Sequence, residues 1–442
     1  MTHSFVLKNG TIVNEQTSIE GDLAMTDGRI SQVGGTATGL QELDVNGAWI
    51  LPGMIDDQVH FREPGLEYKA TIATESRAAL AGGITSYMEM PNCNPQTINN
   101  TRLLEKHDRA AARSLANYGF YLGATNDNLE DIKSVDRFMA CGVKVFMGAS
   151  TGNMLVDDPA TLEGIFASCP LLIATHCEHT PTIQENEEEA RKLHGSNPPP
   201  ELHAEIRSAE ACLRSSTMAV DLAKRFGSRL HVLHLTTEVE LDLFQPGPLE
   251  SKRITGEVCI HHLYFDDSWY ARKGADIKCN PAIKRPEDQR ALQQALVDDR
   301  VDVIATDHAP HTRSEKDQDF LDAPAGLPLV EFALPCLLEL VKSGTLSLET
   351  AVAKTSHAPA TLFNVKERGF LREGYWADIA VVDPNLDTDI DKTEIRSKCG
   401  WSPFSGLTFS TRVTDTFVNG VHMYSNGRFQ SEQCGQALEY DR

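Results

Sequence analysis

The residues best suited to chemistry in this sequence are polar side chains that close short apolar segments. In IDDQVHFREPG (55–65), alternate side chains of an extended chain share one face, so we expect Gln58, His60 and Arg62 to point the same way. Other β-rich segments end in or contain a polar residue: Asn92, Lys144, His176, His234 and Asp307. In a parallel barrel the carboxyl ends of the strands surround one mouth, where these side chains would converge.

Three histidines and an aspartate at separate strand ends favour a metal centre. One such histidine is more often a satisfied core residue, but several buried together would each need a partner. Imidazole and carboxylate ligands suit zinc, with manganese, cobalt or iron as alternatives. The 10 cysteines are scattered without C-x-x-C, which indicates reduced thiols rather than disulfides or a thiolate zinc site. We therefore predict zinc, one or two ions per chain.

Lys144, in GVKVFMG, does not fit a metal site as an ammonium group. The simpler interpretation is a lysine that extends its amine from a strand end to water. Desolvation can, however, lower the lysine pKa enough to leave a neutral amine, which can add carbon dioxide and become a carbamate. A carbamate has two oxygens and can bridge two metal ions, so Lys144 is a candidate ligand.

The segments that would position these residues alternate between strand and helix from 53 to about 365. Stretch 201–227, for example, has apolar residues at helical spacing and ends in a glycine stop. Eight βα units predict an α/β fold with a TIM-type (β/α)8 barrel. A doubly wound sheet is the alternative, weakened because no G-x-G-x-x-G follows the first strand. The eight candidate strands are MIDDQVHF, ITSYMEM, GFYLGA, VKVFMG, LLIATH, LHVLHL, ITGEVCI and VDVIATDH.

The two chain ends resemble each other in style. Both contain short β segments broken by Asn-Gly and similar turns. We therefore predict that 1–52 and 366–442 together form one small β module, sandwich-like, and that 53–365 is a barrel inserted between its halves.

Composition excludes several kinds of partner. The formal net charge of the 442 residues is −22, which argues against a nucleic acid or an anionic membrane surface. No run of about 18 apolar residues occurs, and the first residues lack a signal-peptide pattern. We predict a cytoplasmic protein with a small-molecule substrate; whether it forms a homo-oligomer stays open.

Eight ordered motifs carry a resemblance to a known family. They are IDDQVHFREPG, EMPNCNP, GVKVFMGAS, THCEH, LHVLHLTT, CNPAIKRPEDQRAL, VIATDHAPH and SKCGWSPFSG. In this order they resemble the cyclic-amide branch of the amidohydrolase superfamily, and within it the dihydroorotase family most. The resemblance extends over nearly the whole chain, including GFLREGYWADIAVVD in the predicted β module.

The resemblance implies a two-zinc site. The lysine that matches Lys144 is carbamylated and bridges the ions, His176 and His234 match the ligands of one ion, and His60 and Asp307 match ligands of the other. The sequence departs from the family at Gln58, where the family has the first histidine of H-x-H. An amide oxygen is a weak zinc ligand, so Gln58 is an uncertain ligand and the ion beside it should bind less tightly.

The resemblance also implies a substrate. A guanidinium at Arg62 can hold a carboxylate bidentately, and Asn92 and His311 match the rest of the family's carboxylate site. The expected reaction is the metal-dependent interconversion of dihydroorotate and N-carbamoyl-L-aspartate in pyrimidine biosynthesis, with Asp307 as the catalytic proton acceptor. An allantoinase or hydantoinase is one alternative, and a catalytically silent barrel that supports a partner enzyme is another. Family positions that contact the ring correspond to Asn280, Ala325 and Gly326.

Overall fold

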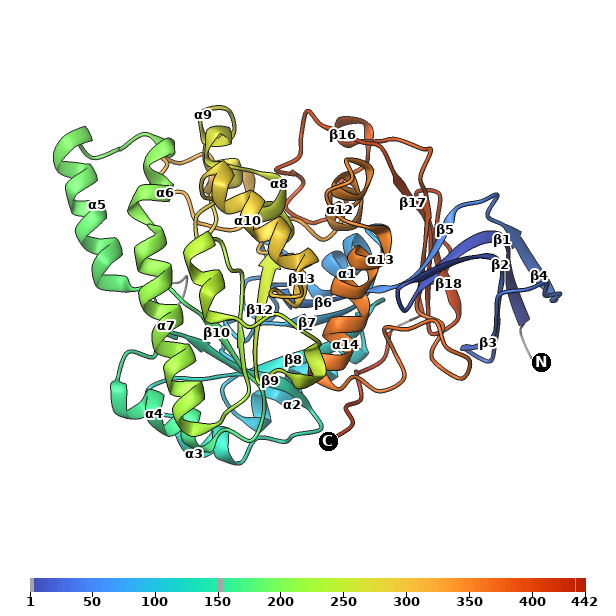
Figure 1. Ribbon diagram of the computed structural model, residues 1–442, viewed down its shortest axis with the longest axis horizontal. Helices are drawn as coiled ribbons and strands as arrows, with labels where there is room; N and C mark the ends of the chain where they lie inside the picture. Colours follow the sequence, from blue (N-terminus) through green and yellow to red (C-terminus); the bar gives the residue numbers. More distant parts are fainter. Residues whose placement is uncertain (1–3, 149–153, 434) are drawn as a thin grey trace.

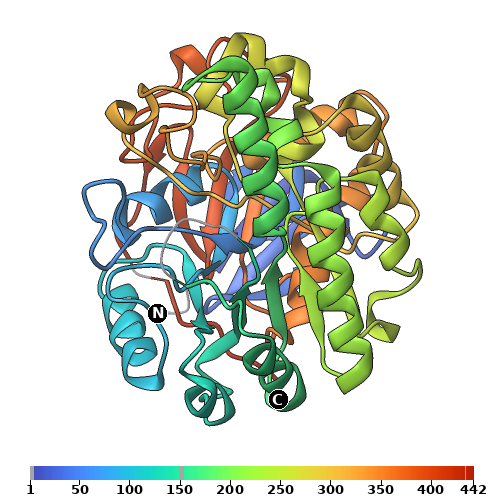
Figure 2. The ribbon, with the colours of Figure 1, turned by 90° about the vertical axis from the view of Figure 1, so that its left-hand side faces the viewer.

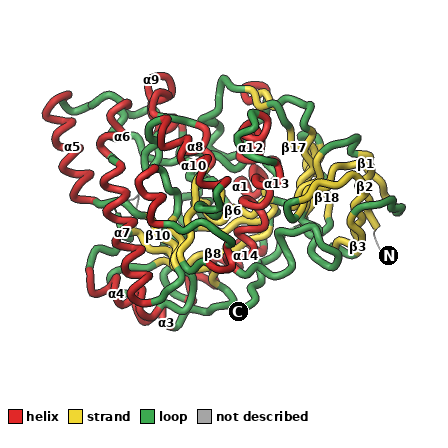
Figure 3. Tube along the Cα trace, in the orientation of Figure 1, coloured by secondary structure: helices red, strands yellow, loops and turns green. Residues whose placement is uncertain are grey.

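The computed structural model describes residues 4–148, 154–433 and 435–442. Its ribbon shows helices packed around a central set of strands, with a second group of strands at one side (Figure 1). The tube coloured by secondary structure separates the two parts clearly (Figure 3). No helix among the described residues is long and apolar enough to cross a membrane.

The central strands form the predicted barrel. Eight strands pair in chain order, each parallel to the next. The first and last are joined by a parallel bridge from Val59 to His308, and His60 N–H donates to the carbonyl of His308 at 2.7 Å. The strands are β6 (Met54–Val59), β7 (Ile84–Glu89), β8 (Asn117–Gly123), β9 (Ala140–Phe146), β10 (Ile173–His176), β11 (Leu230–Val232), β12 (Ile254–Cys259) and β13 (Val303–Ala305).

Helices lie outside the strands, as the turned view shows (Figure 2). The longer ones are α1 (Ile72–Ala81), α2 (Asn100–Ala111), α4 (Pro159–Ser168), α5 (Thr180–His194), α7 (Ala209–Phe226), α10 (Pro286–Val297) and α12 (Ala333–Lys342). The predicted helix across 201–227 is in fact divided. A short α6 (His203–Ile206) ends at Arg207, and Ser208 caps α7 by accepting from the Ala211 N–H. The glycine stop is confirmed, because Gly227 takes the left-handed conformation with φ of 69°.

Strands from both chain ends form the second sheet. Its order is β19-β18-β17-β14-β5-β1-β2-β3, with β4 paired to β1. The two ends meet where β5 pairs antiparallel with β14, as in Ile50 opposite Val381. The strands are β1 (Ser4–Asn14), β2 (Thr17–Thr26), β3 (Arg29–Val33), β4 (Gln41–Asp44), β5 (Trp49–Pro52), β14 (Ile379–Asp383), β17 (Arg412–Val418), β18 (Val421–Ser425) and β19 (Arg428–Phe429).

The last residues leave this sheet and return to the barrel. Ala437 bridges to Tyr118 of β8, and the Leu438 N–H donates to the Tyr118 carbonyl at 2.8 Å. Tyr440 is buried beside them. The boundaries predicted at 52/53 and 365/366 stay a prediction.

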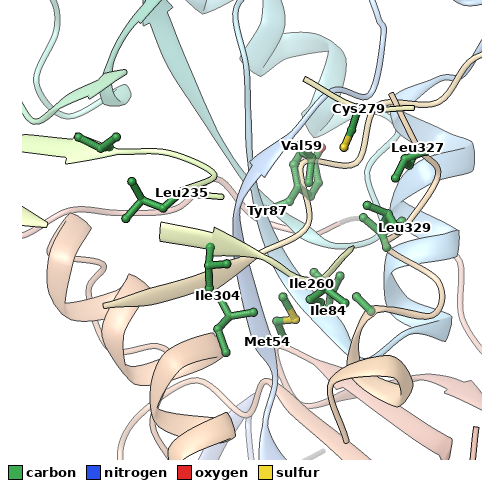
Figure 4. Close-up of a cluster of buried hydrophobic side chains, with 14 of the residues drawn as sticks. Met54, Val59, Ile84, Tyr87, Leu235, Ile260, Cys279, Ile304, Leu327 and Leu329 are labelled. Atoms are coloured by element: carbon green, nitrogen blue, oxygen red, sulfur yellow. The ribbon is translucent and has the colours of Figure 1, made fainter. Parts of the chain in front are cut away.

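A cluster of buried hydrophobic side chains fixes the orientation of β6 relative to the neighbouring strand β7 (Figure 4). Met54 and Val59 are at most 1% exposed and belong to the same core cluster as Ile84 and Tyr87 of β7. Because side chains alternate along a strand, anchoring Val59 in this core turns its neighbours Gln58 and His60 to the other side.

Candidate functional site

A pocket at the carboxyl ends of the barrel strands brings most of the predicted residues together. Ten of them line it: Gln58, His60, Arg62, Lys144, His176, His234, Asn280, Asp307, Ala325 and Gly326. Phe146 and Ala309 complete the described lining and were not predicted. Asn92 and His311 do not line the pocket; each instead contacts a residue that does.

His176 and His234 form one half of the pocket. His176 Nδ1 lies 3.0 Å from His234 Nε2, so one ring nitrogen of each faces the same point. Burial lowers the pKa of both imidazoles, that of His234 well below its usual value, and so keeps them neutral. Neutral imidazole nitrogens at this spacing can bind one metal ion together.

A carboxylate holds His176 in this orientation. His176 Nε2 donates to Glu178 Oε2 at 3.1 Å, and Arg207 forms a short ion pair with the same oxygen. Although burial opposes the charge, Arg207 and His176 lower the pKa of Glu178 to about 2, so it is ionised. A carboxylate on the far nitrogen fixes the tautomer of a metal-binding histidine. Glu178 was not predicted from the sequence, although it lies only two residues after His176, the last residue of β10.

His60 and Asp307 form the other half. His60 Nε2 lies 3.1 Å from Asp307 Oδ1, while His60 Nδ1 lies 2.7 Å from the amide oxygen of Asn92. An amide oxygen only accepts, so Nδ1 carries the proton and Nε2 keeps a lone pair toward Asp307. Asn92 therefore orients His60 here, in addition to the substrate role that the family resemblance implies for it.

Gln58 points its amide nitrogen at the aspartate. Gln58 Nε2 donates to Asp307 Oδ1 at 3.1 Å, and its oxygen lies 4.0 Å from Cys259 Sγ. In this orientation the side chain offers Asp307 a hydrogen bond, whereas a histidine here would offer a lone pair. The interaction fits the expectation that Gln58 contributes little to metal binding.

Lys144 lies between the two halves. Its side chain is 1% exposed, and burial lowers its pKa to about 8. The amine stands 4.7 Å from the centroid of the Phe146 ring, and no hydrogen bond or salt bridge joins it to another described residue. A buried amine with this pKa is partly neutral near pH 8, which is the form that adds carbon dioxide.

Arg62 brings a buried positive charge to the rim. It is 5% exposed; Nε donates to the Pro310 carbonyl at 3.0 Å, and Nη2 lies 3.1 Å from His311 Nε2. Lys69 donates to His311 Nδ1 at 2.9 Å. Burial, with Arg62 and Lys69 nearby, pushes the pKa of His311 far below its usual value, so the ring is neutral. Within the described chain, no carboxylate lies within salt-bridge distance of Arg62.

Three of the pocket residues have a left-handed backbone. The φ angles are 71° at Arg62, 41° at His234 and 49° at Asp307, each two or three residues after the end of a barrel strand. Residues other than glycine rarely adopt this region, and when they do the position is often functional. Here it turns each side chain over the barrel mouth.

The donor set fits a metal centre. Neutral nitrogens pair at 3.0 Å in one half, a nitrogen and a carboxylate oxygen lie 3.1 Å apart in the other, and a buried lysine stands between them. His60, His176, His234 and Asp307 offer atoms that could hold metal ions, and the buried Lys144 lines the same pocket.

Comparison with known proteins gives matches over nearly the whole chain. A dihydroorotase of Methanothermobacter thermautotrophicus is 32% identical over 412 residues, which cover 92% of this chain and 91% of that protein. A dihydroorotase of Halobacterium salinarum is 34% identical over 388 residues, 87% of this chain and 89% of that one.

Solved structures agree on the architecture. The L-hydantoinase (dihydropyrimidinase) from Arthrobacter aurescens superposes with a TM-score of 0.91 at 26% identity, covering 99% of this chain and 100% of that one. A dihydropyrimidinase from Brevibacillus agri gives 0.88 at 23% identity over 99% and 100%, which supports the fold alone. The model described as "Amidohydrolase family" matches residues 49–423, so the chain belongs to the amidohydrolase family.

Proposed function

We propose that this protein is a dihydroorotase: a metal-dependent cyclic amidohydrolase that interconverts dihydroorotate and N-carbamoyl-L-aspartate in pyrimidine biosynthesis. The family, the relatives of that name and the two pairs of ligand atoms support a hydrolase of cyclic amides. We propose zinc as the metal and a carbamate on Lys144. A cytoplasmic location stays a prediction from the sequence.

The burial of Arg62 without a carboxylate partner in the described part of the chain is the observation that favours dihydroorotate as the substrate. A guanidinium that is 5% exposed and has no carboxylate partner among the described residues requires an anion, because an unpaired buried charge is costly. Its Nε donates to the Pro310 carbonyl. Nη2 faces His311 Nε2, which carries the ring proton because Nδ1 accepts from Lys69, so Nη1 and Nη2 both keep N–H groups for a ligand. Dihydroorotate carries a carboxylate on its ring, and carbamoyl aspartate keeps that carboxylate in its open chain. The net charge of −22 would repel such substrates, so a local cation is needed.

Each group of pocket residues would have a separate role in the proposed reaction. When bound, divalent ions would acidify a water molecule and polarise the ring carbonyl. Asp307 would accept the proton of that water and deliver it to the leaving ring nitrogen. Arg62 would hold the carboxylate, while Asn280 and the Ala325–Gly326 backbone would border the ring. Ring closure of carbamoyl aspartate uses the same groups in reverse.

A hydantoinase is the second candidate, supported by the structural match to the Arthrobacter enzyme. Hydantoins and dihydropyrimidines, the rings for which that enzyme is named, do not carry the carboxylate. The buried Arg62 therefore favours dihydroorotate. A silent scaffold is the less favoured alternative, because each proposed ligand except Gln58 keeps a side chain that can bind a metal ion.

The experiment compares Arg62→Ala with the unmodified protein on dihydroorotate and on a neutral hydantoin. We expect kcat/KM for dihydroorotate to fall, mainly because KM rises; the loss corresponds to about 2–4 kcal/mol of transition-state stabilisation. Hydantoin turnover should change far less. Arg313→Ala, an exposed arginine paired with Asp276, is the control and should leave both rates unchanged. Equal losses on both substrates, or faster hydantoin turnover by the unmodified protein, would count against a dihydroorotase.

A further inference from the structure

A second cluster of potential metal ligands lies inside the barrel, apart from the pocket lining. Asp57 of β6, His231 of β11 and Glu257 of β12 are each 0% exposed, and one ligand atom of each lies within 4.8 Å of the others. Asp57 follows Asp56 at an irregularity of β6, where the four residues from Asp56 to Val59 lie opposite three on β7. Such a bulge re-aims side chains, so Asp57 and Gln58 can both face the interior.

Four polar atoms of this cluster have no hydrogen-bond partner among the described residues. They are both carboxylate oxygens of Asp57, Oε2 of Glu257 and Nε2 of His231. Leaving buried polar atoms unpaired is costly, and native structures rarely leave several in one place. A group that binds all four would remove this cost.

The surroundings orient the free atoms. The Thr255 hydroxyl donates to the Leu230 carbonyl at 3.2 Å, so its oxygen accepts from His231 Nδ1 at 2.8 Å. Nδ1 therefore carries a proton, and Nε2 faces the carboxylates. Glu257 Oε1 accepts the backbone N–H of His234 at 3.1 Å, which leaves Oε2 for the cluster. A histidine held through its far nitrogen is typical of metal ligands.

The distances within the cluster fit the spacing of two ligands around one metal ion. His231 Nε2 lies 3.4 Å from Asp57 Oδ2 and 3.6 Å from Glu257 Oε2. A charged histidine donating to a carboxylate would lie at about 2.7–2.9 Å. Two ligands of one zinc ion, each about 2.0–2.2 Å from the metal, lie roughly 3.3–3.6 Å apart in tetrahedral geometry.

We propose that Asp57, His231 and Glu257 bind a divalent first-row transition ion, such as zinc, inside the barrel. Two carboxylates that are 0% exposed carry two negative charges, which a divalent ion balances. Although burial opposes it, Asp57 and Glu257 raise the pKa of His231 to about 9, so the ion would take the place of the proton on Nε2. The ion would be structural, joining β6, β11 and β12. The proposal does not depend on the reaction catalysed in the pocket.

The test measures metal in full-length protein expressed with added Zn²⁺ and dialysed against EDTA. In the Lys144→Ala background, chosen to weaken binding in the open pocket, we expect about one zinc ion per chain to resist the chelator. Adding Asp57→Asn or Glu257→Gln, which keep the side-chain shape, should remove that ion. His261→Gln is the control: Cys259, His261 and His262 form a neighbouring buried group, and the ion should stay when His261 is replaced.

Anomalous diffraction at the zinc edge locates the ion in the unmodified protein and needs no variant. A peak between His231 Nε2 and the two carboxylates would support the proposal. No chelator-resistant zinc, loss of the ion in His261→Gln, or a map with no peak there and His231 within about 2.9 Å of a carboxylate would overturn it.

Discussion

The two halves of the pocket are supported in different ways. His176, in one half, donates to an ionised carboxylate, Glu178, which Arg207 holds in turn. His60, in the other half, donates to the neutral amide of Asn92, and Asp307 accepts a hydrogen bond from Gln58. A carboxylate behind a histidine makes it a better ligand than an amide does. We therefore expect the half with His176 to hold a metal ion more tightly than the half with His60.

The largest effect on metal content and activity should come from replacing Lys144, the residue that both halves of the pocket would share. Lys144→Ala should lose metal from both halves and with it nearly all activity, while the barrel stays folded, because it deletes a bridging ligand rather than a core side chain. Metal analysis, turnover and circular dichroism of one preparation test this. Short carboxylic acids should restore part of the rate by replacing the carbamate.

The matched control is Lys354→Ala, another buried lysine, paired with Asp299 far from the metal ligands. It should lower stability and leave the metal in place. Full activity of Lys144→Ala would exclude the carbamate.

Removing the carboxylate support should affect one half only. We expect Glu178→Gln to weaken metal binding by His176 and His234 by about 10–100-fold. The position beside His60 should keep its affinity. Titration with a competing chelator measures both. Glu240→Gln is the control, because Glu240 is also buried but contacts Ser216 and Thr237. Similar losses from both positions would show that the halves are not independent.

The smallest effect should come from strengthening the weak half. Under mild chelation we expect the ion at His60 and Asp307 to leave first. Gln58→His should raise occupancy toward two ions per chain, because it replaces an amide donor with an imidazole lone pair on the same strand face. Activity should change by less than about tenfold, since Asp307 is kept. Two equally tight ions in the unmodified protein would contradict this asymmetry.

The sequence was informative where one strand sets the geometry. Period-two alternation and barrel topology place His60, His176 and Asp307 at one mouth, and the structure confirms the eight strands. Asn92 and His311 could not be placed as closely, because side-chain reach decides whether a residue lines a pocket or stands behind it. The break in the helix at Arg207 could not be predicted from local sequence either, because the helical spacing of apolar residues continues through this position. The Arg207 side chain forms an ion pair with Glu178, which is distant in sequence.

The left-handed backbone at Arg62, His234 and Asp307 has a consequence for how the protein can change. Glycine would relieve strain of about 1 kcal/mol or more at each point, so the most stable chain would carry glycine there. That chain would also lack a carboxylate anchor, a ligand and a proton acceptor. Selection for thermal robustness alone would therefore erode function, and a search for stabilised variants should hold these three positions fixed.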